Sequence, residues 1–246
     1  MKILALDSSG LVASVALVTE TQLIGEYTIN YKKTHSQTLL PMIDVMFQQL
    51  EMDIAEVDAI AVAGGPGSFT GLRIGAATAK GLGLALNKPL VHIKTTEGMA
   101  YQMYGVEGVI CPIMDARRSQ VYTGIYAFDL EGELSGEANR SFHVIEEQMA
   151  ISIEDLVEKL NYLGQTVTFL GDGVTVHRAY IEENLIVPFF FAPTYCNCQN
   201  AAAIGALAVT YYEQGKVETA EAFQPDYLRV SQAERERAER LKKTRT

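Results

Sequence analysis

The chain has no tryptophan, and only three cysteines and four histidines occur among its 246 residues. The cysteines, Cys111, Cys196 and Cys198, are too few for a disulfide framework. A structural zinc site needs four ligands, and no histidine stands at ligand spacing from Cys196 and Cys198. We therefore expect reduced thiols, no bound metal and no other cofactor.

Long apolar runs and an excess of basic side chains are also absent. No apolar run could span a bilayer, and the first residues turn polar at Asp7 without a signal-peptide cleavage pattern. We expect a soluble, cytoplasmic protein with no membrane partner. The net charge of −10 argues against direct RNA binding by the folded body, because phosphate contacts dominate such affinity.

The last sixteen residues differ from the rest of the chain. Residues 231–246 contain six basic side chains and three glutamates, a net charge of +3, which leaves −13 for the remainder. A solvated, frayed helix is the favoured interpretation of this charged tail, and a binding tail is the alternative.

The pattern of apolar residues predicts two α/β halves of similar order. The predicted strands are 2–8, 12–18, 23–31, 59–63, 90–93, 109–115, 120–128, 133–144, 167–170 and 187–191. The predicted helices are 36–50, 69–86, 95–103, 153–163, 176–184 and 200–212. This order predicts mixed sheets flanked by helices, in a duplicated fold with a cleft between two lobes. We expect an N-terminal lobe at 1–104 that the returning segment 200–230 completes, a C-terminal lobe at 105–199, and the tail.

The most unusual stretch, residues 59–86, reads AIAVAGGPGSFTGLRIGAATAKGLGLAL. It predicts a buried strand, a glycine-rich turn and a helix capped by Ser68 or Thr70. That helix carries a row of small residues spaced by four: Gly71, Gly75, Ala79 and Gly83. Glycine inside a helix costs about 1 kcal/mol relative to alanine, so close packing must compensate. The row packs either on the chain's own sheet or on a second protein.

The glycine turn matches no common nucleotide-binding or hydrolase motif. A P-loop needs a Lys-Ser/Thr pair after its last glycine, but Leu72 and Arg73 follow Gly71. The third glycine of a dinucleotide fingerprint would come one residue late, and no serine stands in a Gly-x-Ser-x-Gly elbow. A structural turn is therefore favoured.

Polar residues follow the first strand of each predicted lobe. The candidates for a vestigial nucleotide cleft are Asp7, Ser8, Ser9, Asp115, Arg118, Gly171 and Gly173. Two aspartates flanking a cleft would be similar to an ATPase site, and Arg117 and Arg118 could bind phosphate by charge. However, Asp115 precedes Ala116 and arginines, not glycines that could wrap a phosphate. Turn-capping roles are favoured for the aspartates, and a turn is favoured for Gly171 and Gly173.

Four segments together resemble the TsaB family, also called YeaZ. They are MKILALDSS at the start, HSQTLLP at 35–41, GGPGSFTGLRIGAATAKGLGLALNKPL at 64–90 and YLR at 227–229. The resemblance extends from the first residue to about residue 230. It implies an actin-like ATPase (ASKHA) fold of two lobes. It also implies a role in bacterial formation of threonylcarbamoyladenosine in tRNA, beside the catalytic relative TsaD.

The resemblance further implies that helices of the first lobe bind TsaD and that TsaE joins the pair. By similarity, the interface residues are Leu39, Met42, Ile43, Met46, Arg73, Gly71, Gly75, Ala79, Leu82 and Gly83. The same face is expected to form a homodimer when the protein is alone. Contact with tRNA is expected to be indirect only.

One departure from the TsaD pattern bears on catalysis. TsaD-like proteins hold a metal through two histidines in a His-x-Glu-Gly-His pattern, and Thr95 and Met99 stand at the matching positions here. We therefore expect no catalytic residues, and a scaffold or activating subunit for modification of position 37 in tRNAs that read codons beginning with A. The alternative is a stand-alone ATPase or small-molecule kinase of the same fold, for which Asp7, Asp115 and Arg118 are the supporting residues.

Overall fold

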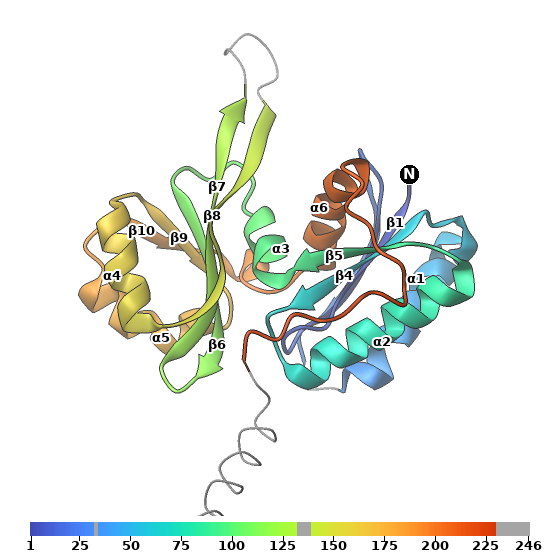
Figure 1. Cartoon of the computed structure of the whole chain (residues 1–246), viewed down its shortest axis with the longest axis horizontal. Helices are drawn as coiled ribbons and strands as arrows, with labels where there is room; N and C mark the ends of the chain where they lie inside the picture. The colour runs from blue at the N-terminus through green and yellow to red at the C-terminus, as the bar shows by residue number, and fades with distance from the viewer. Residues whose placement is uncertain (32–33, 132–138, 230–246) are drawn as a thin grey trace, which may run out of the picture.

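The computed structural model describes residues 1–31, 34–131 and 139–229, and the charged tail predicted at 231–246 lies outside them. The described chain forms two lobes, each built on a five-stranded mixed sheet (Figure 1). The first sheet contains β1 (Ile3–Asp7), β2 (Ala13–Val18), β3 (Leu23–Ile29), β4 (Ala59–Gly65) and β5 (Leu90–Lys94). The second contains β6 (Val109–Arg117), β7 (Gln120–Glu131), β8 (Asn139–Ser152), β9 (Val167–Leu170) and β10 (Phe189–Phe191).

The two sheets share one topology. The first has the order β3-β2-β1-β4-β5, and the second has the order β10-β9-β6-β7-β8, which is the same arrangement read from the other edge. In each lobe the first three strands are antiparallel neighbours, and the last two join the other side of the first strand in parallel. This repeat confirms the duplicated, actin-like ATPase fold that the sequence predicts.

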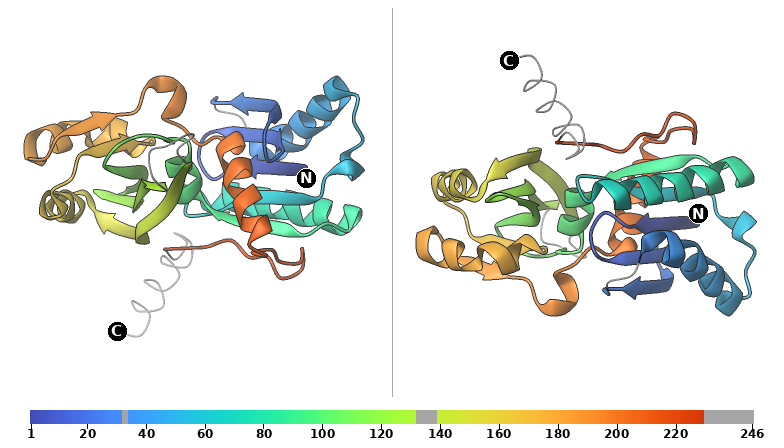
Figure 2. Two further views of the ribbon diagram at one scale, coloured as in Figure 1. Left: turned by 90° about the horizontal axis from the view of Figure 1, so that it is seen from above. Right: turned by 90° about the horizontal axis from the view of Figure 1, so that it is seen from below.

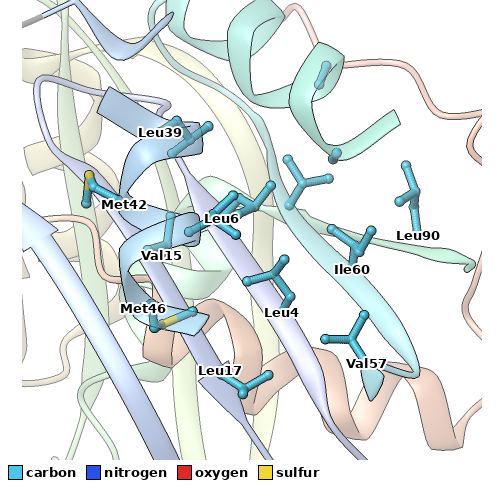
Figure 3. Close-up of a cluster of buried hydrophobic side chains, with 14 of the residues drawn as sticks. Leu4, Leu6, Val15, Leu17, Leu39, Met42, Met46, Val57, Ile60 and Leu90 are labelled. Carbon is cyan, nitrogen blue, oxygen red and sulfur yellow. The ribbon is translucent and has the colours of Figure 1, made fainter. Parts of the chain in front are cut away.

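Helices cover both faces of the first sheet (Figures 1 and 2). α1 (His35–Leu50) and α2 (Phe69–Leu86) pack on one face, and α6 (Ala201–Glu213) packs on the other. β1 contributes side chains to the apolar cores on both faces of the sheet, because successive side chains of a strand alternate. Leu4 and Leu6 point toward α1 and α2, whereas Ile3 and Ala5 point toward α6. Figure 3 shows Leu39, Met42 and Met46 of α1 lying over Leu6, Val15 and Leu17.

The second lobe and the junction between the lobes have their own apolar layers. α4 (Ile153–Leu163) and α5 (Gly173–Asn184) pack on the second sheet. α3 (Thr95–Tyr101) lies between the lobes, where its Met99 packs against Met114 and Leu170. The chain therefore has an apolar contact between its two halves in addition to two cores in the first lobe and one in the second.

Most predicted elements are confirmed, and α4 and β9 have the predicted bounds. The predicted end of β8 at residue 144 is wrong, because the strand continues to Ser152. β8 lies at a sheet edge, where polar residues such as Glu146 and Glu147 reach solvent while the backbone still pairs with β7. Two short 3₁₀ turns, Ile54–Glu56 and Thr194–Cys196, were not predicted.

The glycine row of α2 faces the chain's own lobe, so its prediction as a partner surface is wrong. A Cβ at Gly71 would lie 2.0 Å from the Ser8 carbonyl oxygen, and one at Gly75 would lie 2.6 Å from Ser8 Oγ. At Gly83 it would meet Leu90 and Ala220, and Ala79 is fully buried. The missing side chains let α2 approach the end of β1 closely.

The apolar stripe predicted on α1 is likewise internal. Leu39, Met42, Ile43 and Met46 are all buried in the core beneath α1. Of the ten predicted interface residues, only Arg73 and the partly buried Leu82 reach the surface of the described chain. The faces of α1 and α2 that remain accessible are described below.

A pair of alanine substitutions tests this packing. Gly71→Ala should lower the free energy of unfolding by about 1–3 kcal/mol, because overpacking against a backbone carbonyl forces α2 away from β1. Gly81→Ala is the matched control, because beyond the adjacent backbone of α2 no atom of the described residues lies within 4 Å of the new Cβ. It should raise stability by about 0.5–1 kcal/mol. Urea unfolding measures both, and equal stability of the two variants would contradict the described orientation of α2.

Candidate inter-lobe site

A cavity of about 590 Å³ opens between the two lobes. The first lobe contributes residues 9–11 after β1 and residues 66–70 at the start of α2. The second lobe contributes residues 114–117, Tyr122 and Asp172. The C-terminal segment, residues 226–229, lines the remaining side. This inter-lobe cleft is where the sequence predicts a vestigial nucleotide site.

Asp7 ends β1 as a buried carboxyl group. Its Oδ1 accepts hydrogen bonds from Ser9 N at 2.8 Å and Ser9 Oγ at 2.7 Å, whereas Oδ2 has no hydrogen-bond partner among the described residues. Burial raises the pKa of Asp7 from 3.8 to about 6, although the Ser9 bonds and the nearby His35 oppose the shift. Such a group costs stability at neutral pH and resembles the carboxyl groups kept at functional sites.

The loop after β1 is tied to the first turn of α2. Ser8 Oγ donates to the Gly71 carbonyl oxygen at 2.9 Å, and Ser68 N donates to the Ser9 carbonyl oxygen at 2.6 Å. Ser68 Oγ accepts from Gly71 N at 3.3 Å, so the predicted cap by Ser68 is confirmed. The side chain of Ser8 is therefore engaged in the contact with α2. Of Ser8 and Ser9, only Ser9 lines the cleft.

The second-lobe side of the cleft centres on two aspartates. Asp115 Oδ1 accepts from Arg117 N at 2.8 Å, and Asp172 Oδ1 accepts from Asp115 N at 3.1 Å. Burial raises the pKa of Asp172, and the neighbouring Asp115 charge adds to the shift. Arg117, Arg118 and Ser119 all have positive φ, between 56° and 62°. Asp115 therefore caps a tight turn, as the sequence analysis favoured, and Arg118 does not line the cleft.

Gly171 and Gly173 serve the turn that holds Asp172. Gly171 has φ +107°, and a Cβ there would lie 2.2 Å from the Ile113 carbonyl oxygen. A Cβ at Gly173 would lie 2.8 Å from the same oxygen. Both glycines allow this turn to contact β6, in agreement with the favoured interpretation.

The cleft therefore combines groups of both signs. Among the described lining residues, the acidic groups are Asp115, Asp172 and Asp226, and the basic groups are Arg117 and Arg229. The turn after Asp115 has no glycine whose bare backbone could surround a phosphate. The second-lobe turn therefore offers the Arg117 side chain but no glycine backbone to the cleft, whereas Gly10 and Gly67 line its first-lobe side.

The sequence analysis did not place residues 226–229 in the cleft, because it assigned them only to the returning segment 200–230 of the first lobe. The YLR motif at 227–229 could have indicated a functional segment, but it was used only as one of the segments that carry the family resemblance. Tyr227 packs on Phe69 at the start of α2, with ring centroids 4.8 Å apart. Arg229 Nη1 donates to the Ala116 carbonyl oxygen at 2.6 Å.

Thr95 and Met99 lie in the interior, not at the cleft surface. Thr95 is fully buried, and Met99 packs in the apolar layer between the lobes. Glu97 of the same helix accepts a hydrogen bond from Tyr211 OH of α6 at 2.8 Å. Within the described ranges, no three His, Cys, Asp or Glu side chains are grouped as they would be to bind a metal ion.

A second surface feature lies outside the cleft. An apolar groove of about 550 Å³ runs between α1, the 3₁₀ turn at Ile54–Glu56 and α2, and it is lined by Leu40, Ile43, Phe47, Met52, Ile54 and Leu82 together with polar side chains. Leu40 and Leu84 are more than half exposed. The accessible face of α2 contains Thr70, Arg73, Ala77, Gly81, Leu84 and Ala85. We call this groove and the accessible face of α2 the α1–α2 outer face.

None of the helices in the described part of the chain combines the length and the hydropathy needed to cross a membrane.

Comparisons with known proteins agree with this geometry. A protein-family model described as "TsaD: tRNA N6-adenosine threonylcarbamoyltransferase" matches residues 22–237. The chain is 31% identical to the tRNA threonylcarbamoyladenosine biosynthesis protein TsaB of Bacillus subtilis, over 95% of this chain and 96% of that protein. It is 32% identical to the protein of the same name from Haemophilus influenzae, over 93% and 94% of the two chains.

A solved structure shows the same fold at similar length. YeaZ from Pseudomonas aeruginosa has a TM-score of 0.72 and 26% sequence identity, over 92% of this chain and 100% of that chain. The duplicated lobes and the family match together define a TsaD-like protein of the actin-like ATPase fold. Within that class, the chain belongs to the TsaB (YeaZ) family.

The buried carboxyl group of Asp7 makes a testable contribution to pH dependence. Between pH 3.8 and about 6 the folded state binds more protons than the unfolded state, so this group lowers stability as the pH rises. Asp7→Asn removes that cost and keeps an acceptor for Ser9. Its stability relative to the natural protein should therefore improve by up to about 3 kcal/mol between pH 4 and pH 7.

Chemical denaturation at a series of pH values measures this difference. Asp44→Asn on the exposed side of α1 is the control for removing one carboxylate from an acidic protein. A pH-independent difference between Asp7→Asn and the natural protein would show that Asp7 does not titrate in this range.

Proposed function

We propose that this protein is a non-catalytic subunit of the machinery that forms N6-threonylcarbamoyladenosine at position 37 of tRNAs reading codons beginning with A. It would hold a TsaD-like catalytic subunit in its working state, and a TsaE-like ATPase would join the pair. The observation that carries the proposal is similarity over 95% of the chain to a protein named for biosynthesis of this nucleoside.

The inter-lobe cleft supports an accessory role. Its second-lobe turn lacks glycines, and its lining carries more acidic than basic side chains. Thr95 and Met99, where the TsaD pattern has histidines, are packed in the interior. Met99 is a soft thioether and Thr95 a weak ligand, so neither offers a good site for a hard metal ion.

The α1–α2 outer face is the surface that we assign to the TsaD-like partner. The groove exposes apolar side chains, including Leu40, on a protein with net charge −10, and Leu84 is exposed on the accessible face of α2. Ala77, Gly81 and Ala85 leave the backbone of α2 accessible, so a partner helix could approach closely. Arg73 and Leu82 are retained from the predicted interface. In the absence of the partner, a second copy of the chain would cover the same face, whereas tRNA would be contacted only indirectly.

A stand-alone ATPase or small-molecule kinase is the alternative, and the buried Asp7 favours it. A carboxyl group with one oxygen lacking a partner at the end of β1 is retained at a cost in stability. Titration calorimetry of the isolated protein with ATP and Mg²⁺, followed by a phosphate-release assay, separates the two functions. Micromolar binding with turnover would favour the alternative.

Depletion of the protein from its own cells tests the proposed function. The fraction of threonylcarbamoyladenosine in digested tRNA, measured by mass spectrometry, should fall several-fold and recover with the natural gene. Undiminished modification after depletion would contradict the proposal.

Charge substitutions test the assigned partner surface. Leu40→Glu with Leu84→Glu should weaken binding to the TsaD-like subunit at least tenfold, because an unpaired carboxylate would be buried at the interface. Tyr162→Glu is the matched control, because Tyr162 is highly exposed on α4 of the other lobe. Calorimetry measures both affinities, and equal affinities would place the partner elsewhere.

A further inference from the structure

The C-terminal strap, residues 218–229, crosses the first lobe after α6. It begins with an antiparallel bridge between Glu218 and Leu90 of the edge strand β5. Leu90 N donates to the Glu218 carbonyl oxygen, and Glu218 N donates to the Leu90 carbonyl oxygen, each at 2.9 Å. Figures 1 and 2 show it running beside α2 toward the second lobe. The strap therefore belongs structurally to the first lobe, although it follows the whole second lobe in sequence.

Burial and a lysine anchor the middle of the strap. Ala220 and Phe223 are almost completely buried in the core beneath α2. Lys80 Nζ of α2 donates to the Glu221 and Phe223 carbonyl oxygens at 3.1 and 3.0 Å. These contacts explain how an irregular segment is held along a helix.

The end of the strap remains attached to the first lobe as it enters the cleft. Asp226 N donates to the Gly64 carbonyl oxygen at 2.7 Å, and Gly64 lies at the end of β4. Arg73 Nε donates to Tyr227 OH at 3.4 Å, beside the ring contact between Tyr227 and Phe69. His92 lowers the pKa of Asp226, so its side chain is a carboxylate at neutral pH.

Asp226 and Arg229 of this segment also contact the second lobe. Gln148 Nε2 of β8 donates to Asp226 Oδ2 at 3.1 Å. Arg229 donates to the carbonyl oxygen of Ala116, within the turn that carries Asp115. Residues 226–229 thus connect β4 and α2 of one lobe to β6 and β8 of the other, across the cleft whose side they line.

We propose that residues 226–229 are an inter-lobe latch that sets the separation of the two lobes. α3 provides the apolar junction about which the lobes can turn, and the latch spans the cleft with polar contacts. Loss of the Arg229 and Gln148 contacts opens the cleft while the strap stays on the first lobe. Arg73 lies on the α1–α2 outer face and donates to Tyr227 of the latch. Binding of a partner to that face would therefore change the contacts of the latch.

Distances between spin labels test the latch in the full-length protein. Labels are placed at Gln49→Cys on α1 and Glu158→Cys on α4, both exposed helical positions in opposite lobes. Cys196→Ser and Cys198→Ser remove the partly exposed thiols, whereas Cys111 stays, because burial raises its pKa to about 12 and keeps it unreactive.

Arg229→Ala combined with Gln148→Leu should shift the inter-lobe distances to longer values and broaden their distribution. Arg229→Lys should stay close to the natural distribution, because lysine can still donate to the Ala116 carbonyl oxygen. Arg178→Ala, which removes an exposed arginine of α5, is the matched control and should leave the distances unchanged. Unchanged distances in the folded double variant would overturn the latch.

Amide hydrogen exchange separates a latch from general stabilisation of the strap. In the Arg229→Ala variant, exchange at Arg117 N, in the second-lobe turn that Arg229 contacts, should become faster. Exchange at the three first-lobe amides Asp226 N, Leu90 N and Glu218 N should not change, because the strap stays on the first lobe. Faster exchange at all three amides would mean that Arg229 stabilises the whole strap, and would overturn the proposal.

Discussion

The close approach of α2 to the end of β1 is the contact on which the rest of the molecule depends. Gly71 and Gly75 lack side chains where Ser8 presents its carbonyl and hydroxyl oxygens, so helix and strand meet almost backbone to backbone. That contact fixes the loop after β1, where Asp7 and Ser9 lie, and it directs the first turn of α2 into the cleft. The energetic cost of glycine in the helix is offset by packing within the lobe.

Because the row of small residues Gly71, Gly75, Ala79 and Gly83 packs inside the lobe, the other side of α2 remains exposed at the surface. The helix has a second set of small or exposed residues, including Ala77, Gly81 and Ala85, a third to a half turn away from the first row. A Cβ at Gly81 would meet no atom within 4 Å, in contrast to every position of the inner glycine row. One helix therefore packs into the core with one face and leaves its other face, with small and exposed residues, accessible.

The sequence predicted the elements and the duplication well, because buried strands and amphipathic helices carry periodicity that survives folding. It did not predict the orientation of α2. Spacing by four identifies a face of a helix but not what packs against it, and α2 has small residues on two faces. It also did not predict that the strap enters the cleft, since residues 218–229 have neither the period of a helix nor that of a strand. Their positions are set by contacts with residues far away in sequence, such as Lys80, Gln148 and Ala116.

The strap changes how the cleft should be understood. In a duplicated fold, a ligand bound between the lobes can hold them together, but this cleft has an arginine-rich turn without glycines and a mixed-charge lining. Asp226 and Arg229 of the chain itself provide contacts between the lobes at this cleft, and Lys94 of β5 also pairs with Glu147 of β8. Asp7 is retained at the buried end of β1, two residues before Ser9 of the cleft lining, although the ionised group lowers stability. The C-terminal segment of the chain therefore joins the two lobes beside the cleft, in addition to the apolar junction at α3.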